Sequence, residues 1–276
     1  MLIRYGYEIS ITCAGPTPLV CLLGVHPERA VDVRSAEQMV TQPEVATTTY
    51  WDLYGNLCRR LVAPPGDFSL SGDGTIEDHG NPDPICWDAA EIPVADLPDD
   101  CLIYLMGSRY CETDRLSQIA WDIFEHVSPG WGRVQAICDF VNQHISFDYM
   151  SARATRTAFE AYQEGIGVCR DYAHLAIAFC RCMNIPARYV NGYLGDIGVP
   201  VLDPMDFSAW IEVYLGGRWM TFDPRNNVPR IGRIVVARGR DAVDTPLINS
   251  FGQHVLNSFR VWTYDVDNVP PSFASC

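Results

Sequence analysis

Residues 165–180 read GIGVCRDYAHLAIAFC and decide how the second half of the chain folds. Gly165 and Gly167 break the helical pattern of the preceding residues. Apolar residues recur with helical spacing after them, which predicts a helix from about Cys169 to Met183. Cys169 would then lie at a helix N-terminus, where unpaired N–H groups and the helix dipole lower the pKa of a thiol. The stretch therefore predicts a nucleophilic cysteine, although an arbitrary cysteine more often serves as small apolar packing.

A second stretch, residues 208–223, reads SAWIEVYLGGRWMTFD and predicts a β-hairpin with a Gly-Gly turn. This turn predicts that Trp210 faces Asp223 and that Ser208 faces Arg225 on the opposite strand. Ser208 and Asp223 then lie on one face as diagonal neighbours within side-chain reach. A base at position 208 and a carboxylate at position 223 could serve a nearby cysteine, but position 208 carries a serine.

Helical spacing predicts further helices upstream of this hairpin. Apolar residues recur every three or four positions in residues 115–127 and 133–145, and residues 157–164 predict a third, shorter helix. Pro186 ends the helical region. Strands are predicted beyond it, in the hairpin and at residues 187–194, 233–237 and 259–266.

The first hundred residues predict strands instead. Residues 2–12 alternate polar and apolar side chains, residues 20–27 form a short apolar run, and residues 46–66 are β-branched and aromatic up to a Pro-Pro-Gly turn. Together, these strand-like segments predict an antiparallel β-sandwich or barrel-like domain.

The segment from Asp73 to Asp100 carries nine acidic residues, four prolines and no arginine, which predicts an irregular, solvated crossing. We therefore expect a domain boundary near the end of this segment. The predicted domains are a β-rich domain at residues 1–105 and a second domain at residues 106–276, which includes the last strand.

Composition excludes several classes of protein. The 276 residues are 48% apolar and carry a net charge of −14, which disfavours disorder and binding to nucleic acid or anionic membranes. No apolar run approaches the roughly 18 residues of a membrane span, and the N-terminus lacks a signal-peptide core. We expect a soluble, cytoplasmic protein. All 20 basic residues are arginine, so the α-amino group of Met1 is the only primary amine in this sequence.

The eleven cysteines are odd in number and irregularly spaced, which predicts free thiols. Cys180 and Cys182 form a C-x-C pair without a histidine or second pair at ligand spacing, so a zinc site is not expected. The chain also lacks P-loop, HExxH, GxSxG and dinucleotide-binding motifs. No metal or cofactor is predicted.

Two long segments carry a family resemblance. GVCRDYAHLAIAFCRCMNIPARYVNGYLGD at residues 167–196 and MDFSAWIEVYLGGRWMTFDPRNNVPRIGR at residues 205–233 resemble bacterial cysteine proteases of the transglutaminase-like superfamily. The core of that family reads Cys, then His-Ala-Trp, then Asp-Pro. DLYGN and APPG in the first hundred residues resemble the β-rich domain that precedes this core, and SRYCETDRLSQIAW resembles the segment that joins them.

The resemblance implies a papain-like α+β core in which a helix-N-terminal cysteine is the nucleophile, a histidine the general base and an aspartate its orienting partner. Cys169 matches the nucleophile and Asp223 the orienting acid, whereas Ser208 stands in the position of the histidine. A serine hydroxyl does not titrate near neutrality, so it cannot take the thiol proton and return it to a leaving amine. His174 is rotated by roughly 140° from Cys169 on the helix and is expected to pack beneath the site. His144 and His254 cannot be placed from the sequence.

Three interpretations of Ser208 remain open: a constructed inactive variant, a natural pseudoenzyme, or an enzyme that uses another base or the thiolate alone. The first function hypothesis is acyl transfer from a peptide or glutamine amide through a thioester on Cys169, with hydrolysis preferred over crosslinking. The second is a non-catalytic peptide-binding module. Either function implies a peptide or protein partner and no cofactor.

Overall fold

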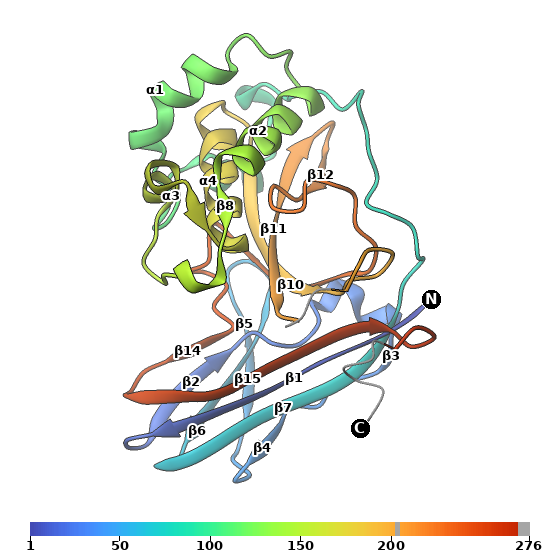
Figure 1. Ribbon diagram of the computed structural model, residues 1–276, viewed down its shortest axis with the longest axis vertical. Coiled ribbons are helices and arrows are strands. Elements are labelled where there is room, and N and C mark those ends of the chain that lie inside the picture. The colour runs from blue at the N-terminus through green and yellow to red at the C-terminus, as the bar shows by residue number, and fades with distance from the viewer. Residues whose placement is uncertain (202–204, 270–276) are drawn as a thin grey trace.

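The computed structural model describes residues 1–201 and 205–269. Two parts lie against each other in Figure 1: a helical part with a central sheet, and a pair of long sheets beneath it. The fold is α+β, with mostly antiparallel sheets, as predicted.

The two long sheets form the predicted sandwich. The first sheet has the order β15-β1-β7-β3, with β4 also paired to β7, and the second has the order β14-β2-β6-β5. The strands of the first sheet are β1 (Leu2–Cys13), β3 (Val33–Ser35), β4 (Val40–Gln42), β7 (Gly66–Glu77) and β15 (His254–Asp265). Those of the second are β2 (Thr17–Cys21), β5 (Thr48–Trp51), β6 (Leu57–Ala63) and β14 (Ile248–Ser250).

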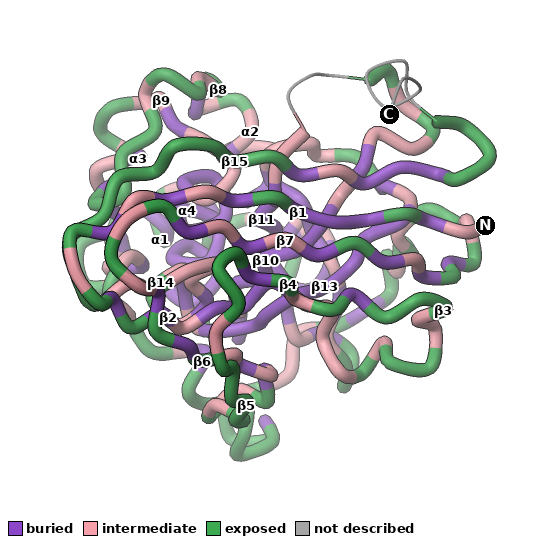
Figure 2. Tube along the Cα trace, turned by 90° about the horizontal axis from the view of Figure 1, so that it is seen from below, coloured by how far each residue is buried: buried purple, intermediate pink, exposed green. Residues whose placement is uncertain are grey.

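Burial alternates along β1, as its sequence pattern predicted. Ile3, Tyr5, Tyr7, Ile9 and Ile11 are all buried between the sheets. Figure 2 shows this alternation, while the first half of β15 is exposed throughout. Because a strand turns successive side chains to opposite faces, the apolar half of the alternating run becomes the sandwich core.

The last two strands pair with the N-terminal part of the chain. β15 is antiparallel to β1 over nearly its whole length, and β14 pairs with β2. The predicted division near residue 105 stays a prediction. The sheet order adds that the sandwich takes strands from both ends of the chain.

The described residues form four α-helices in the upper part: α1 (Thr113–Phe124), α2 (Trp131–His144), α3 (Ala158–Glu164) and α4 (Cys169–Cys182). The predicted apolar stripes face inward, since Leu116, Ala120 and Phe124 of α1 and Val134 and Ile137 of α2 are buried. The helix α4 is almost entirely buried and packs against the other helices and the central sheet. It therefore serves as the core element of this part.

The central sheet has the antiparallel order β12-β11-β10-β13. Its strands are β10 (Ala187–Leu194), β11 (Phe207–Leu215), β12 (Arg218–Phe222) and β13 (Arg233–Gly239). Gly216 and Gly217 form the predicted two-residue turn with φ of 57° and 80°, values that suit a primed hairpin turn. The register Ile211–Phe222 through Leu215–Arg218 is the predicted one.

The remaining elements are short. A two-stranded parallel sheet joins β8 (Ser146–Phe147) to β9 (Ile166–Gly167), and it lies directly before α4. Short 3₁₀-helices are η1 (Pro27–Asp32), η2 (Val94–Asp96), η3 (Asp99–Leu105) and η4 (Tyr149–Ser151).

The acidic segment begins within β7 and is irregular from residue 78 to residue 93, largely as predicted. Asp83 in this segment accepts hydrogen bonds from the Arg233 side chain and from the Arg230 main-chain N–H. These bonds attach the irregular acidic segment to β13 and to the loop that precedes β13. No helix in the described residues is long and apolar enough to cross a membrane.

Candidate functional site

Cys169 is the first residue of α4, as its sequence context predicted. The two-residue strand β9 lies just before α4 in the chain, and Gly167 is its last residue. A Cβ on Gly167 would lie 2.7 Å from the Asp171 side chain, so the tight entry into α4 requires glycine. The sulfur thus begins a buried helix directly after a constrained turn.

Asp171 secures that turn. Its Oδ2 atom accepts hydrogen bonds from the Val168 N–H at 2.9 Å and from Arg156 at 3.1 Å, and its side chain is buried. An aspartate in the first helical turn satisfies an N–H near the helix start and complements the positive end of the dipole. The position of Cys169 is therefore held by buried, charge-assisted bonds.

The environment of the Cys169 thiol has opposing effects on its pKa. Burial is the largest influence and raises the pKa. The Arg225 guanidinium and a hydrogen bond from the Ala209 main-chain N–H lower it, whereas the Asp206 and Asp223 carboxylates raise it further. The net direction is upward, so the thiol of this chain is protonated at neutral pH, contrary to the effect expected from the helix N-terminus alone.

Ser208 lies on β11 opposite Gly192 of β10 and adjoins Ala209, the residue whose N–H faces the sulfur. Its side chain is buried, with 7% of the residue exposed, and its Oγ atom has no hydrogen-bond partner among the described residues. Buried hydroxyls are nearly always bonded. An unpartnered hydroxyl at this position marks a site where a polar group of a ligand or a larger side chain would find a contact.

Asp223 directly follows β12 and is buried. Its Oδ2 accepts hydrogen bonds from Arg233 at 2.8 Å and from the Asn226 side chain at 2.7 Å, while its Oδ1 accepts the Asn226 N–H at 2.9 Å. Burial alone would raise the pKa of this carboxyl, but Arg233 and Asn226 together hold it below its ordinary value. Asp223 is therefore an ionised, fully bonded carboxylate.

The structure brings the three predicted residues into one region. Cys169 contacts β11 at Ala209, next to Ser208, and the Asp223 carboxylate acts on the Cys169 thiol. The ladder between β11 and β12 ends at Ile211–Phe222, so the two pairs predicted beyond it are not ladder pairs. The expectation that Ser208 and Asp223 are diagonal neighbours within side-chain reach stays a prediction.

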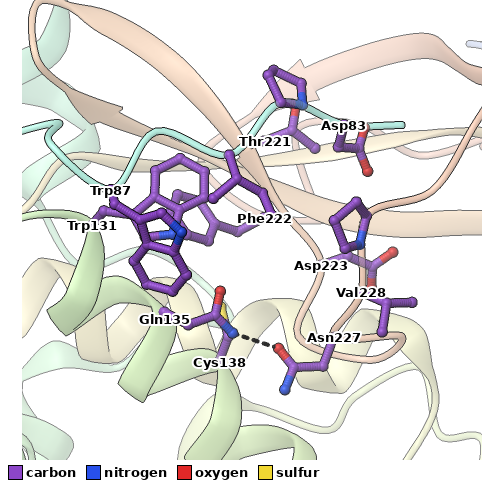
Figure 3. A pocket seen from close by; sticks show the side chains of 13 residues that line it. Asp83, Trp87, Trp131, Gln135, Cys138, Thr221, Phe222, Asp223, Asn227 and Val228 are labelled. Carbon is purple, nitrogen blue, oxygen red and sulfur yellow. Dashed lines mark hydrogen bonds between the residues drawn. The ribbon is translucent and has the colours of Figure 1, made fainter. Parts of the chain in front are cut away.

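The loop that carries Asp223 and Arg225 is anchored to α2. Figure 3 shows Gln135 of α2 pointing to Asn227, and its side-chain N–H donates to the Asn227 oxygen at 2.9 Å. Asn142, further along α2, donates to the Arg225 carbonyl at 2.7 Å. These bonds fix the loop relative to α2 and, through it, relative to α4.

A cleft of about 610 Å³ opens in front of Ser208. Its wall includes Phe147 and Tyr149 from the segment around β8, Ser208 from β11, and Arg225 from the loop after β12. A separate, smaller cavity of about 60 Å³, drawn in Figure 3, is lined by Trp87, Trp131 and Asp223, and Asp223 does not line the larger cleft. The larger cleft has room for a substrate. Cys169 is not one of its lining residues, but Asp206 and Arg225, whose charges act on the Cys169 thiol, both line it.

None of the three histidines considered from the sequence lines this cleft. His174 packs inside the fold, where its Nε2 accepts the Ala242 N–H at 3.1 Å, and burial lowers the pKa of its ring well below the ordinary value. This placement agrees with the expectation that it packs beneath the site. His144 bonds the Tyr162 carbonyl, and His254 is exposed on β15.

Sequence reasoning missed Asp206, which lines the cleft together with Ser208. Burial raises the pKa of its carboxyl to about 6, and its Oδ1 accepts the Phe207 N–H at 2.7 Å. A signal was available, because Asp206 directly precedes β11 and residues two apart on extended backbone share a face. The interior tryptophan of the hairpin, Trp210, packs under the Arg233 guanidinium in the core and does not line the cleft.

Comparisons with known proteins agree with this architecture. The profile of the Transglutaminase-like superfamily matches residues 117–224, which include all three predicted site residues. The crystal structure of "a Putative Cysteine Protease from Cytophaga hutchinsonii" superposes with a TM-score of 0.86 at 29% identity, over 98% of this chain and 92% of that one.

Curated relatives match over shorter stretches. An uncharacterised protein of Mycobacterium leprae (strain TN) is 38% identical over 92 residues, covering 32% of this chain and 33% of that protein. One of Mycobacterium tuberculosis (strain H37Rv) is 42% identical over 90 residues, covering 29% of each. The chain thus aligns with about a third of the length of these relatives. Together with the fold, the family profile shows that residues 117–224 carry the core of the Transglutaminase-like superfamily, which makes this protein an enzyme by family.

Proposed function

We propose that this chain is a transglutaminase-like cysteine peptidase or amidase scaffold whose acyl-transfer activity is impaired because Ser208 occupies the position of the general base. The observation that carries the proposal is the placement of Cys169 at the start of α4, beside the N–H of Ala209, whose neighbour Ser208 lines the cleft. The roles of Cys169, Ser208 and Asp223 in catalysis are part of this proposal.

In the competent form, the Cys169 thiolate attacks the carbonyl carbon of a peptide or glutamine amide. A C–S bond forms, and the carbonyl oxygen becomes an oxyanion that N–H groups at the start of α4 can bind. The C–N bond then breaks, and the amine leaves with a proton from the general acid. Water hydrolyses the resulting thioester, which releases the acid and returns the proton to the thiol.

A base at position 208 would have to move two protons in this cycle. It would take the thiol proton before attack and deliver a proton to the leaving amine. The Asp223 carboxylate is buried and ionised, so it could stabilise an imidazolium at position 208. The serine that occupies this position can do neither transfer, which supports an impaired enzyme.

The second candidate function is a non-catalytic peptide-binding module. The observation in its favour is the raised pKa of the Cys169 thiol, because a protonated thiol is a poor nucleophile. The absence of histidine among the described residues of the cleft points the same way. In this case the cleft would bind a peptide without cleaving it.

The test is the Ser208→His variant. We expect it to gain turnover of p-nitrophenyl acetate and of peptide substrates by about 10²- to 10⁴-fold over the Ser208 chain, the usual contribution of a general base. The Cys169→Ala, Ser208→His double variant is the matched control and should lose that gain. Exogenous imidazole should partly activate the Ser208 chain.

Two outcomes would contradict the proposal. A correctly folded Ser208→His variant without any thiol-dependent turnover would favour the binding module. Equal activity in the unmodified chain and in the Ser208→His variant would show that another base operates and that the assignment of position 208 is wrong.

A further inference from the structure

Arg225 is unlike the other arginines near the end of the central sheet. Five arginines lie between residues 225 and 240, and four of them have acidic partners. These four pairs are Arg230 with Asp196, Arg233 with Asp83 and Asp223, Arg238 with Glu28 and Glu212, and Arg240 with Asp244. Within residues 1–201 and 205–269, the Arg225 guanidinium makes no ion pair or hydrogen bond, and it stacks on an aromatic ring.

That contact holds the side chain in place. The guanidinium carbon of Arg225 lies 4.2 Å from the centre of the Phe147 ring. Its main chain is bonded on both sides, because its N–H donates to Asp223 at 3.2 Å and its carbonyl accepts from Asn142 at 2.7 Å. Stacking on an aromatic face orients a guanidinium while leaving its in-plane N–H donors free for a ligand.

The side chain of Arg225 belongs to the cleft in front of Ser208, a cleft that Cys169 itself does not line. Arg225 lines the cavity of about 610 Å³ together with Ser208. Its charge is the strongest influence that lowers the pKa of the Cys169 thiol, so the cation lies close to the sulfur. The Ser208 hydroxyl is unpartnered within the described part of the chain, but its oxygen is buried, so Arg225 carries the subsite without it.

Other charged groups of the cleft do not fill this role. Arg230 also lines the wall, but its guanidinium already donates to the Gly195 carbonyl, Asp196 and Asn226. Asp206 is an acid on the same wall, and its Oδ1 is bonded to the Phe207 N–H. The Nε of Arg230 has no partner among the described residues, but it is buried. Arg225 is therefore the partly exposed cation of the cleft whose guanidinium makes no hydrogen bond among those residues.

We propose that Arg225 forms an anion subsite beside Cys169 that binds a carboxylate of the substrate. A guanidinium with open donors matches a carboxylate in a forked, charge-assisted arrangement. The proposal rests on the function above and names its substrate class: a peptide whose scissile amide lies near a carboxylate, from either an acidic side chain or a free C-terminus.

Two alkylating reagents of similar size test the subsite without requiring catalysis. Iodoacetate carries a carboxylate and iodoacetamide is its neutral counterpart. In both reactions the Cys169 thiolate forms a C–S bond, iodide leaves, and the thiol proton passes to solvent. The ratio of the two rates is independent of the thiolate fraction, so it reports recognition of the carboxylate and not the pKa of the thiol.

We expect the iodoacetate-to-iodoacetamide rate ratio at Cys169 to exceed that of glutathione by roughly tenfold, the size expected for one charge-assisted contact. Arg225→Gln should lower the ratio to that of glutathione, and Arg225→Lys should retain part of it. Arg218→Gln is the matched control, because Arg218 lies on the exposed end of β12 against a different thiol, Cys86. Mass spectrometry of the peptide containing Cys169 gives the rates.

A ratio equal to that of glutathione in the unmodified chain would overturn the subsite, as would a raised ratio that Arg225→Gln leaves unchanged. Folding of each variant is checked by its thermal unfolding. Because Arg225 is only partly buried, both substitutions should keep the fold. The rate ratio also tests the anion subsite separately from the proposed enzymatic function. An iodoacetate-to-iodoacetamide ratio above that of glutathione can persist even if Ser208→His proves inactive.

A second set of reagents distinguishes the source of the carboxylate. Chloroacetyl-Asp-amide and chloroacetyl-Asn-amide compare a side-chain carboxylate with its amide. Chloroacetyl-glycine and chloroacetyl-glycinamide make the same comparison for a C-terminal carboxylate. Selective, Arg225-dependent labelling by one acid of the two pairs identifies the substrate's acidic group, and labelling without charge preference in either pair would contradict the proposal.

Discussion

Arg233 donates a hydrogen bond of 2.8 Å to the Asp223 carboxylate, and both side chains are buried. The same guanidinium also bonds Asp83 of the acidic crossing. One arginine therefore neutralises the candidate orienting acid and fastens the crossing to the central sheet. The electrostatics of the site and the stability of the fold depend on the same residue.

Arg233→Met should destabilise the protein by roughly 3–5 kcal/mol, because it leaves the buried Asp223 carboxylate without its cation. Urea unfolding at pH 7 measures the change. Arg4→Met is the control, since the Arg4–Asp73 pair is about half exposed and should contribute less than about 1 kcal/mol. Similar small losses in both variants would show that the buried pair contributes little.

Asp206→Asn should stabilise the protein at high pH and not at low pH. The folded-state pKa of Asp206 is raised to about 6 from an ordinary value of 3.8, so the cost of ionising this carboxyl in the folded state develops as pH rises from about 4 and is complete above about 6. The asparagine can still accept the Phe207 N–H.

We expect a gain of about 3 kcal/mol in the free energy of unfolding at pH 8 that falls below about 1 kcal/mol at pH 4. Asp88→Asn, at an exposed position on the acidic crossing, should change little at either pH. A gain of equal size at pH 4 and pH 8 would mean that the ionisation of Asp206 is not its origin.

The alkylation of Cys169 should depend on the residue at position 208. Because the pKa of the thiol is raised in the present chain, iodoacetamide should label Cys169 more slowly than glutathione at pH 7. In Ser208→His, an imidazolium beside the sulfur should lower the thiol pKa and raise the rate at pH 6 about tenfold or more. If Cys169 of that variant reacts no faster at pH 6 than a free thiol, the activated-nucleophile interpretation is wrong.

Gly167→Ala should disturb the entry into α4. The added Cβ would lie 2.7 Å from both the Cβ and Oδ2 atoms of Asp171, so Asp171 would have to move from its bonds. We expect a loss of about 1–3 kcal/mol in thermal or urea unfolding, as for other overpacked sites. Gly132→Ala in α2 meets no atom within 4 Å and should be neutral or stabilising by up to about 1 kcal/mol, which makes it the matched control.

The absence of lysine gives a simple test of self-crosslinking. If Ser208→His transfers acyl groups to amines, it should modify an added amine such as cadaverine, yet it should not polymerise through isopeptide bonds between side chains, because the sequence has no lysine. Denaturing gels run with reductant measure this. Reductant-resistant ladders of the protein alone would contradict the expectation.

Much of the fold could be predicted from the sequence because the elements that matter have strong local signals. The alternation in β1, the apolar stripes of α1 and α2, and the Gly-Gly turn between β11 and β12 each specify a periodicity or a turn geometry within a few residues. The helix start at Cys169 follows from the same kind of signal. The sequence in which Cys169, Ser208 and Asp223 follow one another along the chain then supported the family resemblance.

Local patterns could not show which strands would pair across the whole chain. The last strand, β15, reads as a strand from its own residues, but only the packed sandwich places it beside β1 at the opposite end of the sequence. Such a pairing depends on the shape of two buried faces, and no pattern of neighbouring residues encodes it.

The protonation of the site was also decided by tertiary structure. The sequence by itself determined that Cys169 begins a helix, that serine stands at position 208, and that no lysine is present. Burial of the thiol and the approach of Asp206 and Asp223 raise the pKa that the helix N-terminus alone would lower, while the stacking of Arg225 on Phe147 leaves a cation open in the cleft. These effects depend on distances between residues far apart in the chain, because desolvation and Coulomb interactions are set by the packed neighbours of a group and not by its neighbours in sequence.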